Sequence, residues 1–443
     1  MQVSLLQILT SLSAGIALIV LLTVRYKVHA FFALVVASLV VGMCVKMHVN
    51  EIIATVKDGF GSIMKSLGLL IVLGTTLGIL LEYSGSTRVM ADQILKLTGA
   101  KRAPLAMSIT GFIVGLPIFC DSGYIVLSGL NNAVSKRTAV PVTVMAPCLA
   151  TGLYAVHCMV PPHPGVSAAA GIIGIEFGPL MLSGVLVAIP AMIAGYCWSV
   201  YAGKNNGGVA PIPGAIPVPE DNSGKLPGVW QAFLPVVMPI VLIALKAFIT
   251  VKDSGSVAGQ FLVVGDPVIV LSIGILLVFI TSKNLDSISV ARLLQEGAEK
   301  AGGILVIIGA GGAFGAVLAA TKIGDHLGSA LPLAQLGLFF PFLLTAVIKT
   351  AQGSSTVAII TASSIVLPLL PALGLNAHHG PMLTVLAMSA GSMLISHSND
   401  AYFWVISRFS GLKMRPMLKI YSLSTLLMGI VAYLSVYILS KII

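Results

Sequence analysis

The sequence predicts an all-α polytopic membrane protein, and two observations support this fold class. The chain of 443 residues is 57% hydrophobic and only 9% charged, whereas soluble domains carry about 25% charged residues. Several segments also exceed the roughly 18 uncharged apolar residues that a helix needs to cross a bilayer. A soluble fold with a very large core is excluded, because the chain has too few amphipathic helices to cover such a core.

The uncharged apolar segments predict about ten membrane crossings. They cover residues 5–24, 28–46, 66–84, 140–160, 178–201, 230–250, 261–281, 302–321, 381–399 and 417–440. Two further apolar stretches, 103–136 and 334–372, are each interrupted by a polar tip, FCDSGY at 119–124 and AQGSST at 351–356. Because each flank of a tip is too short to cross comfortably, we predict that both stretches are re-entrant hairpins.

The distribution of Lys and Arg predicts the orientation of the chain. With these crossings, 17 of the 25 basic residues fall in one set of loops, which is therefore expected in the cytoplasm. Both termini then lie outside. Membrane orientation also explains the net charge of +10, so we expect no nucleic-acid partner. The Gly- and Pro-rich stretch 203–229 is predicted to be a cytoplasmic linker between two transmembrane halves, 1–202 and 230–443.

The two halves resemble each other. LGLLIVLG at 67–74 and GGILVIIG at 302–309 align without gaps. Each follows a charged amphipathic stretch, 51–65 or 286–301, and each precedes a hairpin and then a span that breaks at polar residues. Because each half has an odd number of crossings, the second half must be inverted. Inverted repeats with broken helices are typical of secondary transporters.

The four polar interruptions predict one substrate cavity. Non-helical backbone inside a bilayer must be buried in protein or line a wet cavity, since unpaired amides are costly in lipid. The candidate substrate-binding residues are Asp121, Ser122, Gly123 and Tyr124 in the first tip, Lys349, Gly353, Ser354, Ser355 and Thr356 around the second, and His163, Ser396, His397 and Asn399 in the broken spans. No cofactor and no metal ion are expected.

The residue types at these positions favour a carboxylate ligand. A half-helix that begins at Gly353 would direct free N–H groups and its positive dipole end at an anion. Ionisable groups at such depth are functional candidates, because a charge at the bilayer centre costs at least about 2.5 kcal/mol. For proton coupling these are Asp121, Asp400, His157 and His397. We favour Asp121 over Asp400, because a bound anion beside its carboxyl would favour protonation and so link the two binding events.

Five motifs resemble the gluconate permease (gluconate:proton symporter) family of bacteria, within the larger ion transporter superfamily. They are VPPHPG (160–165), GDPV (265–268), GAGGAF (309–314), QGSSTVAIITA (352–362) and SHSNDAYFW (396–404). The resemblance implies proton-coupled uptake of sugar acids such as gluconate, a homodimer in the inner membrane, and an elevator motion of the hairpins and broken spans. Gluconate-type members often carry Glu where this chain has Asp121, Arg where it has Lys349, and Pro where it has Val166. These departures leave glycerate-like acids, hexuronates and D-serine open as substrates.

Three other functions are alternatives to proton-coupled uptake of a sugar acid. A sodium-coupled carboxylate transporter is the main alternative, because carbonyl, Ser and Asn oxygens at the hairpin tips could hold sodium. An intramembrane hydrolase would need a G-x-S-x-G or H-E-x-x-H motif, and the sequence contains neither. A channel would conduct without proton coupling.

Overall fold

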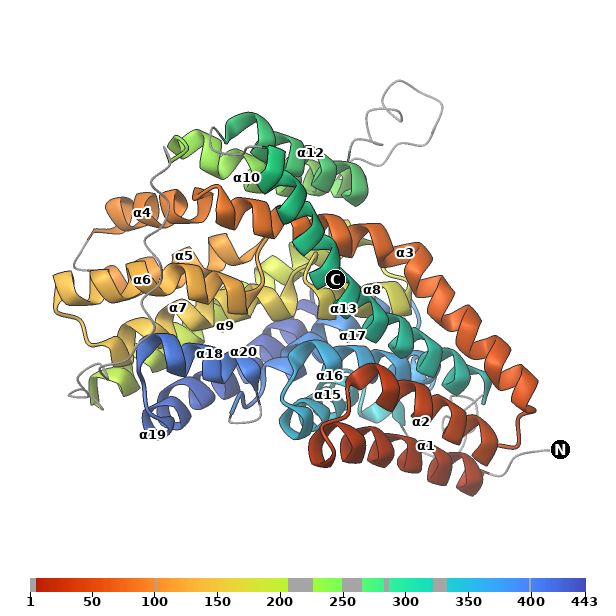
Figure 1. The fold of residues 1–443 in the computed structure, drawn as a ribbon. Helices are drawn as coiled ribbons and strands as arrows, with labels where there is room; N and C mark the ends of the chain where they lie inside the picture. Colours follow the sequence, from red (N-terminus) through yellow and green to blue (C-terminus); the bar gives the residue numbers. More distant parts are fainter. Residues whose placement is uncertain are drawn as a thin grey trace.

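The computed structural model describes residues 5–99, 102–205, 226–248, 265–282, 287–321, 333–397 and 400–443, and every regular element in these ranges is helical. This confirms the all-α fold class. The helices run side by side for most of their length, and α10 and α12 lie along one edge of the molecule (Figure 1).

The described part of the first half contains nine α-helices. They are α1 (Leu5–Val20), extended by a π-helical turn Leu21–Arg25, α2 (Ala30–Cys44), α3 (Val49–Tyr83), α4 (Ser86–Thr98), α5 (Ala103–Gly115), α6 (Cys120–Thr138), α7 (Val142–Met159), α8 (Pro164–Ile173) and α9 (Phe177–Asn205). The predicted linker begins at the end of α9, and its residues 206–225 lie outside the described ranges.

The described part of the second half follows a similar order. It contains α10 (Val229–Phe248), α12 (Pro267–Thr281), α13 (Ser287–Ala320), α15 (Phe339–Gln352), α16 (Ser355–Val366), α17 (Gly380–Met393), α18 (Ala401–Ser410), α19 (Met414–Met417), a π-helical turn Leu418–Ser422 and α20 (Leu423–Leu439). Short 3-10 segments occur at Leu333–Gln335 and Leu367–Leu369.

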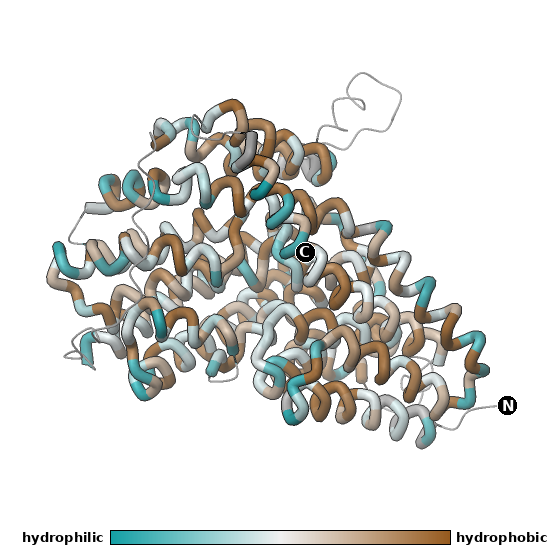
Figure 2. Tube along the Cα trace, viewed as in Figure 1, coloured by the Kyte–Doolittle hydropathy of each residue, from teal (hydrophilic) through white to brown (hydrophobic). Residues whose placement is uncertain are grey.

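The outer surface of this bundle is apolar, as a bilayer requires. Trp230, Ile280 and Leu69 are 86%, 70% and 65% exposed, and hydrophobic segments, drawn in brown, recur along the helices between more polar ones (Figure 2). By length and composition, Val142–Ile173, Phe177–Asn205, Ser289–Ala320 and Met414–Leu439 can each cross a membrane, and α3 adds a fifth if its two bent parts form one span. The chain is therefore a multi-pass membrane protein, and the number of ten crossings stays a prediction.

Helices α3 and α13 are longer than the predicted spans. Each span, 66–84 or 302–321, follows its amphipathic stretch within one helix of 35 or 34 residues, and α3 is bent by 47° between Val49–Lys65 and Leu67–Tyr83. The two long helices pack tightly against each other. A Cβ added to Gly59 of α3 would overlap the carbonyl oxygen of Gly312 in α13, so the close crossing requires this glycine.

The second predicted polar tip separates a pair of helices, but the first was placed too far along the chain. There Leu116–Phe119 lie between α5 and α6, and Cys120–Tyr124 of the predicted tip form the start of α6. In the second, α15 ends at Gln352 and is followed by Gly353, which has a φ of +87°. Glycine adopts this left-handed conformation at little cost, and α16 begins two residues later at Ser355. The Ser354 hydroxyl accepts a hydrogen bond from the Val357 N–H at 3.3 Å and so caps α16.

The broken spans lie at the centre of the bundle. Nearly every residue of α7 and α17 is buried, and the Tyr154 hydroxyl of α7 donates to the Ser392 carbonyl of α17 at 3.1 Å. Each central helix packs against the first helix of one hairpin through a glycine: a Cβ on Gly152 or Gly391 would overlap a backbone oxygen of α5 or α15, respectively.

The second helix of each hairpin packs against the opposite half of the chain. Helix α6 contacts α18, and helix α16 contacts α8. Since α8 and α18 are the halves of the broken spans that follow the break, this reciprocal packing brings both tips and both breaks to the same region of the protein.

Candidate functional site

A cavity of about 560 Å³ lies where the hairpin tips and the broken spans meet. Its wall is built by α6, α7, α13, the second tip and the start of α18. The lining residues are His29, Phe119, Cys120, Asp121, Ser122, Ile125, Tyr154, His157, Pro164, Lys300, Gly303, Ile304, Ile307, Gln352, Gly353, Ser354, Ser355, Thr356, Val357, Asp400, Ala401 and Tyr402. This volume lies in the usual range for small-molecule sites.

Eight of the predicted site residues line this cavity. They are Asp121, Ser122, His157, Gly353, Ser354, Ser355, Thr356 and Asp400. Six others lie outside its lining: Gly123, Tyr124, His163, Lys349, Ser396 and His397. Asn399 lies outside the described residues. The structure thus brings both tips to one cavity, while several polar residues of the breaks lie behind its wall.

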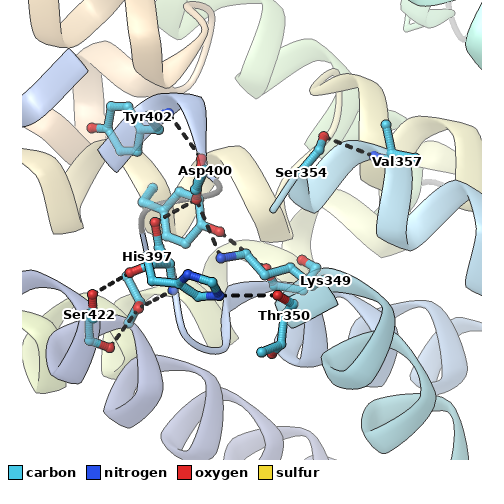
Figure 3. A network of polar contacts seen from close by, with 12 residues as sticks. Lys349, Thr350, Ser354, Val357, His397, Asp400, Tyr402 and Ser422 are labelled. Atoms are coloured by element: carbon cyan, nitrogen blue, oxygen red, sulfur yellow. Dashed lines mark hydrogen bonds and ion pairs between the residues drawn. The ribbon is translucent and has the colours of Figure 1, made fainter. Parts of the chain in front are cut away.

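Asp400 is held by three groups at the start of α18. Its Oδ1 accepts the Tyr402 N–H at 3.0 Å, which caps the helix, and its Oδ2 accepts the Ser396 hydroxyl. The same Oδ2 lies 3.3 Å from Lys349 Nζ (Figure 3). Lys349 is fully buried and does not line the cavity, and its ammonium points to Asp400. The two side chains form a buried ion pair.

Ser396 and His397 brace the break between α17 and α18. Ser396 donates its N–H to the Thr425 hydroxyl at 3.0 Å, and its carbonyl accepts the Ser422 hydroxyl. His397 Nε2 lies 3.1 Å from the Thr350 carbonyl oxygen of α15 (Figure 3). These bonds satisfy backbone groups that the broken helix leaves unpaired.

His163 has a similar structural contact in the first break. Its Nε2 lies 2.7 Å from the Gly115 carbonyl oxygen at the end of α5, and the side chain is buried. The ring centroids of His163 and His157 are 4.9 Å apart. Of the two histidines, His157 lines the cavity and His163 does not, so a ligand in the cavity would contact His157 and not His163.

Three side chains of the cavity wall carry buried polar atoms without a hydrogen-bond partner in the described part of the chain. They are Asp121 through Oδ1, His157 through Nδ1, and Gln352 through both Oε1 and Nε2. An unpaired buried polar atom costs about 1–3 kcal/mol, so native proteins seldom keep one. Several such atoms around one cavity indicate that a polar ligand or water satisfies them.

Lys300 of α13 reaches hairpin residues from across the cavity. Its Nζ donates to the Ser122 hydroxyl at 2.8 Å and lies 5.6 Å from the centroid of the Phe119 ring. Lys300 and His29 are both exposed, so they mark the side on which the cavity meets solvent.

Sequence reasoning did not identify Gln352 or Lys300 as site residues. Gln352 immediately precedes Gly353, so its position in the QGSST motif could have identified it as a site residue. Lys300 lies in a charged amphipathic stretch, and no local signal separates it from its neighbours there.

Comparison with known proteins is consistent with a membrane permease. The family model for "GntP family permease" matches residues 6–442. A gluconate permease of Pseudomonas aeruginosa is 33% identical over 98% of each chain, and a high-affinity gluconate transporter of Escherichia coli is 30% identical over 98% of this chain and all of its own. The YdaH transporter of Alcanivorax borkumensis has a similar fold, with a TM-score of 0.62 and 17% identity over 89% of each chain.

Proposed function

Because this chain belongs to the GntP permease family, we propose that it is a secondary active transporter that imports gluconate or a related sugar acid by proton symport. One observation carries the proposal. The buried, unpartnered polar atoms of Asp121, His157 and Gln352 surround a single cavity between the hairpin tips and the broken spans. This arrangement is suited to a small ligand that is polar along its whole length.

A sugar acid matches the polar groups that line this cavity. Its carboxylate fits the start of α16, where the free N–H groups of the first turn and the Ser355 and Thr356 hydroxyls act as donors. Its hydroxyl groups both donate and accept. They can therefore pair with the Gln352 amide, which offers a donor and an acceptor, and with His157 Nδ1.

The charges around the cavity favour coupling to a proton. Lys349 and Asp400 neutralise each other, which leaves Asp121 as the carboxyl without an ion pair among the described lining residues. A carboxylate ligand beside ionised Asp121 would be repelled, and one proton on Asp121 removes the repulsion and supplies an O–H donor. We therefore propose that Asp121 carries the coupled proton, with His157, His397 and Asp400 as the alternatives.

The fold supports alternating access by an elevator motion. In this proposal the hairpins and broken spans form the moving unit, and the crossed helices α3 and α13 belong to the static part. The two halves of the chain form an inverted repeat, and two chains form a homodimer. The reciprocal packing of α6 on α18 and α16 on α8 supports the repeat. With both termini outside the bacterial inner membrane, the cavity mouth at His29 and Lys300 faces the cytoplasm. Labelling of single cysteines placed in 203–229 and at the termini tests this orientation: cytoplasmic termini would contradict it.

The proposed function is tested by transport in proteoliposomes. Purified protein is supplied with gluconate, glycerate, a hexuronate or D-serine under an inward proton gradient, an inward sodium gradient, or no gradient. We expect a sugar acid to accumulate only with the proton gradient. Accumulation driven by sodium would favour the sodium-coupled alternative, and accumulation of D-serine alone would move the chain to another substrate class.

A further inference from the structure

Lys300 connects two parts of the protein that otherwise pack on different neighbours. Helix α13 packs on α2, α3, α8 and α16, whereas the first hairpin packs mainly on α4, α7, α9 and α18. The Lys300 side chain reaches from α13 to the hairpin, where its Nζ is 2.8 Å from the Ser122 hydroxyl. It therefore crosses the mouth of the cavity.

The charge of Lys300 is only partly balanced in this position, where Glu82 and Asp121 interact with it electrostatically without forming an ion pair. Its hydrogen-bond partner is a neutral hydroxyl, and its second neighbour is the face of the Phe119 ring. Within the described residues, Lys300 forms no ion pair with a carboxylate. The ammonium has three N–H donors and the bond to Ser122 uses one of them, so a carboxylate at the mouth can accept a charge-assisted hydrogen bond from another.

We propose that Lys300 is a substrate-binding residue that donates, from the cavity mouth, to one oxygen of the ligand carboxylate whose other oxygen faces the start of α16. The bond to Ser122 holds the first hairpin against α13 and directs the ammonium to the cavity mouth. The inference rests on the proposed function, because it assumes that the ligand is a carboxylic acid.

A simpler role for Lys300 is a surface contact whose aliphatic stem packs on Phe119. The two roles differ in their dependence on ligand charge. A packing role would change the affinity for a charged and an uncharged ligand equally, whereas a carboxylate-binding role affects only the charged one.

The experiment measures binding of gluconate and of its uncharged amide, gluconamide, to wild type, Lys300→Gln and Lys300→Arg by calorimetry. Arg292→Gln is the matched control, because Arg292 is a basic residue of the same helix that lies over Tyr83 and not in the cavity wall. We expect Lys300→Gln to weaken gluconate binding by about tenfold to a hundredfold. Gluconamide affinity should not change, and Lys300→Arg and Arg292→Gln should bind gluconate as wild type does.

Equal losses for gluconate and gluconamide in Lys300→Gln, or no loss for either, would overturn the proposal. Failure of the proposed function is recognised separately, because wild type itself would then bind no sugar acid. A readout that needs no ligand is the rate at which maleimide labels Ile125→Cys, a position of the same hairpin that lines the cavity and leaves the Ser122 hydroxyl in place. The rate should rise when Lys300→Gln is added and stay constant when Arg292→Gln is added, and an unchanged rate in both would exclude the contact with the hairpin.

Discussion

Lys349 Nζ lies 3.3 Å from Asp400 Oδ2, which joins the second hairpin to the second broken span at the edge of the cavity, whose wall includes Asp400 and not Lys349. Lys349 is fully buried and Asp400 nearly so. Removing two charges from water is costly, and their attraction repays this only in good geometry. The pair is therefore sensitive to the loss of either partner, and Asp400 is less available for proton coupling than Asp121.

The first prediction concerns the stability of this pair. Lys349→Met leaves the Asp400 charge buried and unpaired, so we expect it to destabilise the protein by roughly 3–5 kcal/mol. Asp400→Asn leaves the ammonium unpaired but keeps an oxygen that can cap α18. The double variant removes both charges and should recover most of the loss, as thermal melting in detergent will measure. Lys441→Met is the control at an exposed position. Additive losses in the double variant would show that the two side chains do not act as a pair.

The second prediction concerns coupling. Asp121→Asn cannot exchange a proton but keeps the size and one acceptor oxygen of the side chain. Counterflow exchange of the substrate should survive in this variant, while accumulation driven by a proton gradient is lost. Retained accumulation would transfer the coupling role to Asp400, His157 or His397.

The third prediction concerns recognition of hydroxyl groups by Gln352. Gln352→Leu removes an amide whose two polar atoms have no partner in the described residues. Each lost hydrogen bond to a ligand is worth about 0.5–1.5 kcal/mol, so gluconate affinity should fall by about threefold to a hundredfold for one or two bonds.

Glycerate serves as the comparison ligand in this test, because it has fewer hydroxyl groups and should lose less. The control is Ser363→Ala, since the Ser363 hydroxyl bonds to Ile359 within α16 and does not line the cavity. A uniform loss for both acids would assign Gln352 a structural role instead.

Sequence reasoning located the second tip and the breaks because their signals are local, but it placed the first tip at 119–124, where all residues after Phe119 belong to α6. Gly353 and Ser354 mark the end of one helix and the cap of the next, and Pro161 and Pro162 follow the last turn of α7. The GDPV motif has an equally local basis, since Asp266 caps α12 by accepting the Val268 N–H at 2.9 Å.

The parts of the site that depend on distant contacts were not predictable in the same way. Lys349 and Asp400 are far apart in sequence, and nothing in either motif shows that the ammonium turns to the carboxylate and away from the ligand. Lys300 resembles any basic residue of an amphipathic helix until α13 crosses the mouth of the cavity. Such roles follow from helix packing, which a single sequence does not specify.

The last prediction concerns the size of the acid that the cavity accepts. Gly303 of α13 lines the cavity, and a Cβ added there would meet no atom within 4 Å. Gly303→Val should therefore fold normally and place its side chain in the space that the ligand occupies. We expect transport of gluconate to fall sharply while transport of the shorter glycerate continues, as competitive uptake of the two labelled acids will measure.

Gly302→Val is the matched control, because Gly302 also has no atom within 4 Å of an added Cβ but does not line the cavity. Both substitutions place a β-branched residue at neighbouring positions of one helix, so their effects on helix stability should be similar. A difference between the two variants then reports the cavity alone. Equal loss of both acids in both variants would instead mean that α13 tolerates no larger residue here, and that Gly303 does not limit the size of the ligand.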